Sequence, residues 1–246
     1  MSEISIKAEE LLHIGNFPVT NALLMSLLVF IFLASASILL RKKLSLIPGK
    51  VQSVLELLLE GILNLMDSVL GSRAKSEKYL PFIATIFLFI LFSNWFGLLP
   101  GVGSLVLREG EHGAIPVLRA PSSDLNFTLA LAVLAVVSIN IFGILAIGIA
   151  AHAKKFFDFS NPINFFLGIL ELISEFAKMV SFSFRLFGNI FAGEVLLTII
   201  AFLVPYVIPL PFLFLEVFVG FIQAFVFGML ALVFTAIATT EHATEH

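Results

Sequence analysis

The chain has 246 residues, of which 59% are hydrophobic and only 13% are charged, and its mean hydropathy is +1.08. A water-soluble core cannot bury so much apolar sequence, so the composition indicates a polytopic membrane protein with one integral domain over residues 1–246. The absence of cysteine excludes disulfides and thiolate chemistry, and a net charge of −3 with 14 cationic residues argues against nucleic-acid binding.

The first predicted span covers residues 20–40, which are uncharged and long enough to cross a hydrocarbon core of about 30 Å. Residues 1–19 lack the positive charges of a cleaved signal peptide. Half of all cationic residues lie between this span and the next one. The positive-inside rule therefore predicts a cytoplasmic segment there, and an N-terminus outside.

Residues 48–72 predict an amphipathic helix at the membrane surface or against partner helices. The segment is too charged to span, and its polar residues recur at spacings of four, four and three, which places them on one helical face. These residues are Glu56, Glu60, Asn64 and Asp67.

Residues 79–151 predict two spans, Tyr79–Leu99 and Leu125–Ala151, joined by an outer loop. The loop, residues 100–124, contains glycine and proline and shows no excess of positive charge, which fits the outside. Lys154 and Lys155 follow the third span and mark its cytoplasmic end.

Residues 162–240 predict a helical hairpin. From Pro162 to Val204 the sequence contains no helix breaker except scattered glycines, and a helix of that length measures about 60 Å, twice the hydrocarbon core. An ordinary tilt of about 20° cannot absorb this length. A second long helix, Phe212–Thr240, follows a short turn. The predicted fold is thus an all-α polytopic membrane protein with about five membrane traverses plus an amphipathic surface helix. The last two helices form a long, steeply tilted hairpin, and the C-terminus is cytoplasmic.

Arg185 lies in this hairpin and is the last cationic residue of the chain. A cation at bilayer depth costs roughly 2.5–3.5 kcal/mol on insertion scales, so intramembrane arginines are candidate functional residues. At about 100° per residue, Arg185 shares a face with Lys178 and Asn189. The neighbouring positions on that side are small: Ala177, Ser181, Gly188 and Ala192. Small side chains let another helix approach closely, so we expect Arg185 to lie in a tight helix–helix contact.

Two glutamates accompany this arginine in the hairpin. Glu194 points away from Arg185 on the same helix, so any carboxylate partner of Arg185 comes from another helix or chain. Glu216 and Gln223 share one face of the second helix. An antiparallel register that places Gln223 level with Arg185 also places Glu216 level with Glu194. Carboxylates on the outer side with a fixed cation beyond them resemble an ion path with a barrier.

Structural roles remain open for each of these residues. Arg185 could form a plain interhelical ion pair, Glu194 and Glu216 could be protonated and hydrogen-bonded, and Asn189 and Gln223 could link helices. Metal binding is not expected, because the His242 and His246 pair lies in an acidic tail prone to fraying. No cofactor and no catalytic site on this chain by itself are predicted.

The run SFRLFGNIFAGE resembles subunit a of F-type ATP synthases, together with GFIQAFVFGML and LRAPSSDLNFTLALA. The resemblance runs from about residue 79 to the C-terminus, and the first 78 residues match in layout only. It implies a component of the proton-translocating complex, a stator whose two aqueous half-channels meet a rotating ring of c subunits. The implied partners are this c-subunit ring, the peripheral-stalk b subunits, the remainder of the ATP synthase and the lipid bilayer, most simply a bacterial plasma membrane.

The resemblance also implies roles for single residues. Arg185 matches the essential arginine that faces the ring carboxylate and prevents a short circuit between the half-channels. Glu194 and Glu216 match the outer half-channel. The remaining matches are Asn189 and Gln223 beside the arginine, and Ser181, Asp124 and Lys178 as candidate channel-lining residues.

Two other functions compete with this interpretation. A stand-alone secondary transporter is disfavoured, because the sequence shows neither an inverted repeat nor matched broken spans. A non-conducting membrane scaffold would leave Arg185 and two intramembrane glutamates unexplained. Partner dependence separates these alternatives, since a stator conducts only beside its ring.

Overall fold

A computed structural model describes residues 8–15, 17–42, 44–45, 48–99, 101–102, 106–108, 114–156, 161–204 and 207–240. The helices are α1 (Asn21–Lys42), α2 (Lys50–Leu70), α3 (Arg73–Gly97), α4 (Leu125–Ile147), α5 (Ile149–Lys154), α6 (Pro162–Leu203) and α7 (Pro209–Thr239), with a short 3-10 helix, η2 (Pro121–Ser123). The strands are β1 (Glu10–Ile14), β2 (Phe17–Thr20), β3 (Val106–Arg108) and β4 (Ala114–Pro116), which pair as two antiparallel hairpins.

Five helices, α1, α3, α4, α6 and α7, are long and apolar enough to cross a membrane. They confirm the predicted all-α polytopic class with five traverses, including the long last hairpin. The two β-hairpins were not predicted, because strands of three to five residues leave too short a pattern to read.

Helix ends differ from the prediction where a cap decides them. The helix of the second span begins at Arg73 rather than Tyr79, because the Ser72 side chain accepts a hydrogen bond from the Lys75 backbone N–H at 3.3 Å. The helix of the third span ends at Ile147 rather than Ala151. Gly148, with φ +87°, follows it and separates α4 from α5.

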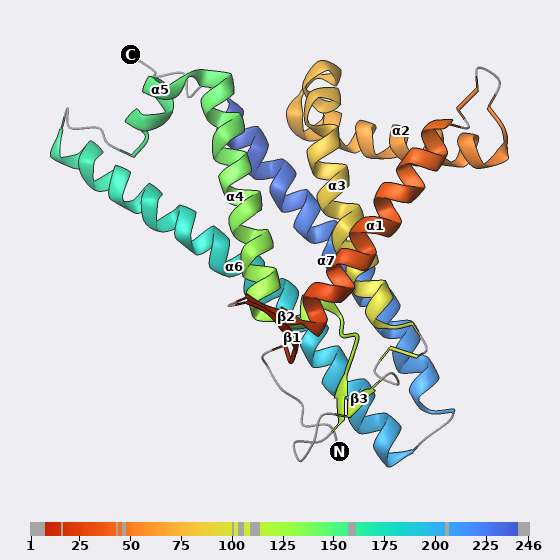
Figure 1. Ribbon diagram of the computed structural model, residues 1–246. Coiled ribbons are helices and arrows are strands. Elements are labelled where there is room, and N and C mark those ends of the chain that lie inside the picture. The colour runs from red at the N-terminus through yellow and green to blue at the C-terminus, as the bar shows by residue number, and fades with distance from the viewer. Residues whose placement is uncertain are drawn as a thin grey trace.

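Figure 1 shows α3, α4 and α7 running together through the molecule, with α2 crossing one end and α6 inclined across the bundle. The core between these helices contains Ile90, Ala132, Ala135, Leu186 and Ala224, all at most 1% exposed. Alanines at such contacts let helices approach closely. α4 is also joined to α6 by the hydroxyls of Thr128 and Ser183, 3.1 Å apart.

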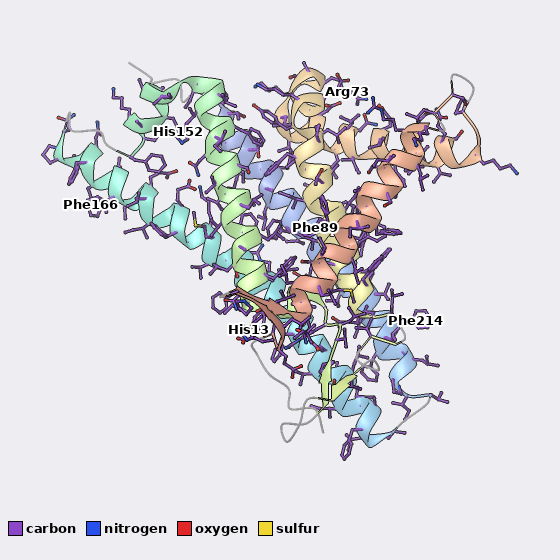
Figure 2. The ribbon with its side chains drawn as sticks, viewed as in Figure 1. His13, Arg73, Phe89, His152, Phe166 and Phe214 are labelled. Atoms are coloured by element: carbon purple, nitrogen blue, oxygen red, sulfur yellow. The ribbon has the colours of Figure 1, made fainter. Side chains whose placement is uncertain are left out.

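The polar stripe of α2 is held by Arg73 at the start of α3. The Arg73 guanidinium donates to Glu60 Oε2 at 2.6 Å, to Asp67 Oδ2 at 3.2 Å and to Asn64 Oδ1 at 3.4 Å. Figure 2 shows Arg73 at the end of α3 that meets α2. This cluster folds α2 back across the bundle, and its place at a membrane surface stays a prediction.

The outer surface of the α6–α7 hairpin is apolar. Phe166 near the start of α6 is 60% exposed, and Phe214 near the start of α7 is 71% exposed. Figure 2 shows both side chains pointing away from the other helices. Exposed phenylalanines at both ends of the hairpin are consistent with lipid contact along its length.

Candidate functional site

Arg185 lies on an exposed face of α6. Its guanidinium donates to Ser181 Oγ at 3.3 Å, one helical turn earlier. Within the described part of the chain, no carboxylate lies within ion-pair distance of this guanidinium. The structural alternative of an interhelical ion pair inside this chain therefore finds no support among these residues.

The small-residue stripe around Arg185 is also uncovered. Its members Ala177, Ser181, Gly188 and Ala192 are all exposed, as is Asn189 beside them. A Cβ added at Gly188 would meet no atom within 4 Å. A tight helix–helix contact was predicted here, and no helix described in this chain makes it.

The hairpin register agrees with the prediction to within one residue. The Phe182 and Phe227 rings lie 4.6 Å apart between α6 and α7. Further along the hairpin, Gly193 lies against the carboxylate of Glu216, and a Cβ at that glycine would overlap it. Glu216 is thus level with Glu194, and Gln223 is level with Arg185 and partly buried.

Two glutamates lie at this level of the hairpin, Glu216 buried and Glu194 partly exposed. Glu216 is only 6% exposed, and its Oε1 has no hydrogen-bond partner among the described residues. Glu194 points one oxygen, Oε1, toward Arg119 Nε at 3.6 Å, and its Oε2 is buried and unpartnered within the same described set. Each glutamate therefore has one buried oxygen without a hydrogen-bond partner among the described residues.

Further unpartnered oxygens lie on neighbouring elements at this end of the molecule. They are Ser93 Oγ and Asn94 Oδ1 on α3, and Ser122 Oγ on η2. α3 and η2 are in direct contact, since a Cβ at Gly97 would meet Ala120. Buried polar atoms in proteins are normally hydrogen-bonded, to water where protein groups do not suffice. These three oxygens and the two glutamate oxygens are therefore positions at which water could bind.

α3 aligns the face of α7 that carries Glu216. Asn94 Nδ2 donates to the Gly220 carbonyl at 2.9 Å, and Trp95 Nε1 donates to the Val217 carbonyl at 3.0 Å. A Cβ at Gly220 would lie 3.1 Å from the Asn94 Cβ, so the glycine admits this close approach.

The candidate channel-lining residues separate in the structure. Asp124 is 5% exposed, and its carboxylate caps α4 by accepting from the Asn126 backbone N–H at 3.1 Å. Lys178 turns away from Arg185, toward Glu175 Oε1 at 2.6 Å and the Phe234 ring. Ser181 alone of these three contacts Arg185.

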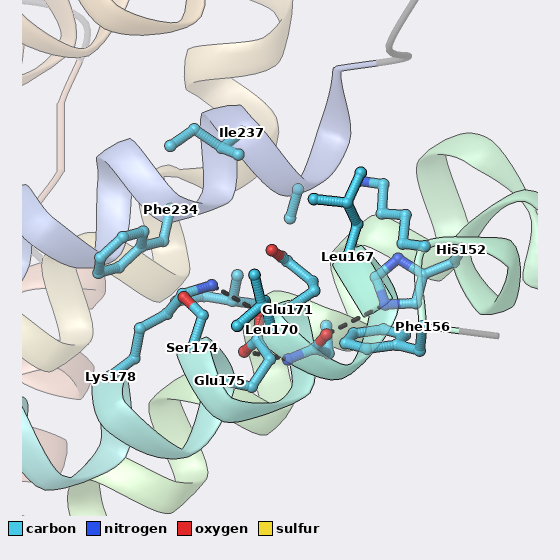
Figure 3. A pocket seen from close by; sticks show the side chains of 14 residues that line it. His152, Phe156, Leu167, Leu170, Glu171, Ser174, Glu175, Lys178, Phe234 and Ile237 are labelled. Atoms are coloured by element: carbon cyan, nitrogen blue, oxygen red, sulfur yellow. Dashed lines mark hydrogen bonds and ion pairs between the residues drawn. The ribbon is translucent and has the colours of Figure 1, made fainter. Parts of the chain in front are cut away.

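A cavity of about 620 Å³ opens at the other end of the hairpin, between α4, α5, α6 and α7. Figure 3 shows a polar chain along its wall. His152 Nε2 lies 3.0 Å from Asn140 Oδ1, Asn140 Nδ2 donates to Glu175 Oε2 at 3.1 Å, and Lys178 closes the chain at Glu175. Glu171 and Ser174 also line the cavity.

Sequence reasoning did not single out Arg119, Asn140 or His152. Arg119 is only 8% exposed, in the segment between β4 and η2. Its signal was a cation in the motif LRAPSSD, which was treated as an outer loop charge. No sequence pattern indicated that Asn140 and His152 are in contact, because only the turn at Gly148 brings α5 back to α4.

The comparisons with known proteins converge on one family. The family model described as ATP synthase A chain matches residues 22–236. ATP synthase subunit a of Moorella thermoacetica is 34% identical over 233 residues, which cover 94% of this chain and 96% of that protein. ATP synthase subunit a of Campylobacter jejuni subsp. doylei is 37% identical over 201 residues, which cover 80% of each chain.

Proposed function

Since the chain belongs to the ATP synthase A chain family, and is therefore a proton-translocating stator subunit of the membrane sector of that enzyme, we propose that it forms two half-channels separated by Arg185. The other ATP synthase subunits are its partners, and the phosphate chemistry takes place on them rather than on this chain.

The observation that carries the proposal is the bare face around Arg185. A guanidinium stays protonated in proteins, so this cation is permanent. It lies on a stripe of small exposed side chains with no carboxylate of the described chain beside it. Such a surface fits a rotating ring of c subunits, whose helices pack closely on the stripe and present one carboxylate after another to the arginine.

The outer half-channel is the hydrated interior around Glu194 and Glu216. Its unpartnered oxygens on α3, η2, α6 and α7 offer sites for water and for protons in transit. The inner half-channel is the 620 Å³ cavity beyond Lys178. Along α6, Glu194 lies about 13 Å and Lys178 about 10 Å from Arg185, in opposite directions. The two paths are therefore offset, with the arginine between them.

This arrangement explains how proton flow becomes rotation. A proton entering from outside reaches a ring carboxylate through Glu216 and Glu194, and the neutral carboxylate moves into the lipid. When the protonated carboxyl group arrives at Arg185, the cation favours its anionic form, and the group releases its proton to the inner cavity. The same cation repels a proton that would cross directly. Each proton gains about 2.3 kcal/mol per 100 mV, so several transfers are summed mechanically for each ATP.

Orientation and the remaining partners belong to the same proposal. α2, α5, the start of α3 and the end of α7 lie at one end of the molecule in Figure 1. Most of the cationic residues that lie between the spans belong to the segments at this end. The positive-inside rule makes this the cytoplasmic end, with the β-hairpins outside a bacterial plasma membrane. The exposed face of α2 is the surface offered to the peripheral-stalk b subunits.

The test compares wild type with Arg185→Ala in the assembled complex, reconstituted in vesicles. ATP-driven proton pumping should be lost, while assembly stays intact and the passive proton leak is retained or raised. Arg41→Ala, which removes an exposed cation at the end of α1, serves as the control and should pump normally. Normal pumping by Arg185→Ala would return this arginine to a purely structural role.

A further inference from the structure

Arg119 is a second buried cation at the outer end of the molecule. Its side chain is 8% exposed, in the segment that joins β4 to η2. The guanidinium donates through Nε to Ser123 Oγ at 3.0 Å and through Nη2 to the Ser123 carbonyl at 3.5 Å. A buried permanent charge is costly unless an anion lies near it.

Glu194 supplies that anion. Its Oε1 lies 3.6 Å from Arg119 Nε, and Arg119 is the one described cation within ion-pair distance of this carboxylate. The pairing occupies one carboxylate oxygen and leaves Oε2 buried and unpartnered in the described structure. A carboxylate held in this way keeps one oxygen available for a water or a proton.

The segment that carries Arg119 is anchored by Asn21, the first residue of α1. Asn21 Nδ2 donates to the Pro116 carbonyl at 3.2 Å and lies 3.5 Å from Glu9 Oε2. Burial raises the pKa of Glu9, and the nearby Arg119 opposes this rise. The position of Arg119 is therefore determined from two sides, by η2 and by the start of α1.

We propose that Arg119 is a positioning residue for proton entry, which fixes the Glu194 carboxylate so that its free oxygen faces the interior shared with Glu216. This inference rests on the proposed function, in which Glu194 belongs to the outer half-channel. Proton transfer between groups is sensitive to placement on the scale of 1 Å, so release of Glu194 slows entry even when the fold is intact.

A double-mutant cycle in the assembled complex tests the proposal. The variants are Arg119→Gln, Glu194→Gln and both together, and the readouts are ATP synthesis driven by an imposed proton gradient and ATP-driven pumping. We expect Arg119→Gln to lower both rates by about tenfold or more. Because Arg119 acts through Glu194, adding Arg119→Gln to Glu194→Gln should cause no further loss. Arg119→Lys, which keeps the charge, should restore part of the rate.

A merely structural arginine would behave differently. Its removal would lower the rates by the same factor whether position 194 is Gln or Glu. Equal losses in both backgrounds, or wild-type rates in Arg119→Gln, would overturn the proposal. If Glu194→Gln itself is fully active, the outer half-channel of the proposed function fails, which is a separate result. Arg41→Gln is the control, because it removes an exposed cation at the end of α1.

Should Arg119→Gln fail to assemble, Arg119→Lys decides the question, because it lacks the Nε atom that faces Glu194. We expect Arg119→Lys to lower the rate when position 194 is Glu and to cause no further reduction in the Glu194→Gln background. A wild-type rate for Arg119→Lys with Glu194 unchanged would refute the positioning role.

Discussion

Gly193 leaves room for the Glu216 carboxylate, and Gly193→Ala removes that room. The new Cβ would overlap the carboxylate, which must move by more than about 1 Å to reach an ordinary contact of about 3.5–4.0 Å. Because Glu216 is only 6% exposed, the surrounding helices resist this movement. Overpacking costs about 1–3 kcal/mol, and the change from glycine to alanine within a helix regains about 1 kcal/mol. The net loss of stability is therefore at most about 2 kcal/mol, and the complex should still form.

The effect on proton transfer should be larger than the effect on stability. A misplacement of about 1 Å can lower the rate of a geometry-dependent step by about 100-fold, so we expect at least a tenfold loss of ATP-driven pumping. The assay is quenching of a pH-sensitive dye in vesicles that carry the assembled complex, together with thermal unfolding in detergent. Gly228→Ala is the control, since a Cβ there would make only an ordinary contact of 3.6 Å with the Phe87 Cβ.

The rescue variant sharpens this test. Glu216→Asp shortens the side chain by one methylene, so in the Gly193→Ala background it should recover part of the lost pumping. If Gly193→Ala instead pumps and unfolds like Gly228→Ala, the Glu216 carboxylate does not lie against Gly193, and the geometry assigned to the outer half-channel is wrong.

Three further predictions concern groups outside the spans. Asp124→Ala removes the cap of α4 and should lower the free energy of unfolding in detergent by about 0.5–2 kcal/mol, whereas Asp124→Asn should retain most of it; equal losses would exclude capping. Burial and, next, Lys155 lower the pKa of His152, so its stabilising effect is present above the ordinary value of about 6.5 and is lost as pH falls below it. Hydrogen-exchange protection of α5 should thus drop on acidification in wild type and not in His152→Gln, and an unchanged wild type would contradict this. Burial raises the pKa of Glu9, so protection of the β1–β2 hairpin should fall as pH rises above the ordinary value of about 4.3, and Glu9→Gln should remove the dependence; the same slope in both proteins would assign it to another group.

Hydropathy and helical periodicity determined much of this protein from the sequence alone. The five spans, the 42-residue helix α6 and the face shared by Arg185 and Asn189 follow from local composition and from 3.6 residues per turn. The sequence also predicted that Glu216 lies at the depth of Glu194, because the antiparallel register that pairs Gln223 with Arg185 brings these two glutamates to one level. Helix ends were less predictable, since Ser72 and Gly148 decide them through single caps and turns.

Tertiary structure alone decided which polar groups meet. Arg119 reaches Glu194 only because η2 packs on α6, and Gly193 receives Glu216 only because two long helices cross closely there. Contacts between residues far apart in the chain leave no period in the sequence, and a loop has no regular face from which to predict them. For the same reason, the sequence did not predict that Lys178 contacts Glu175 and Phe234 instead of lying beside Arg185. The bare face of α6 around Arg185 likewise appears only after the rest of the chain has packed elsewhere.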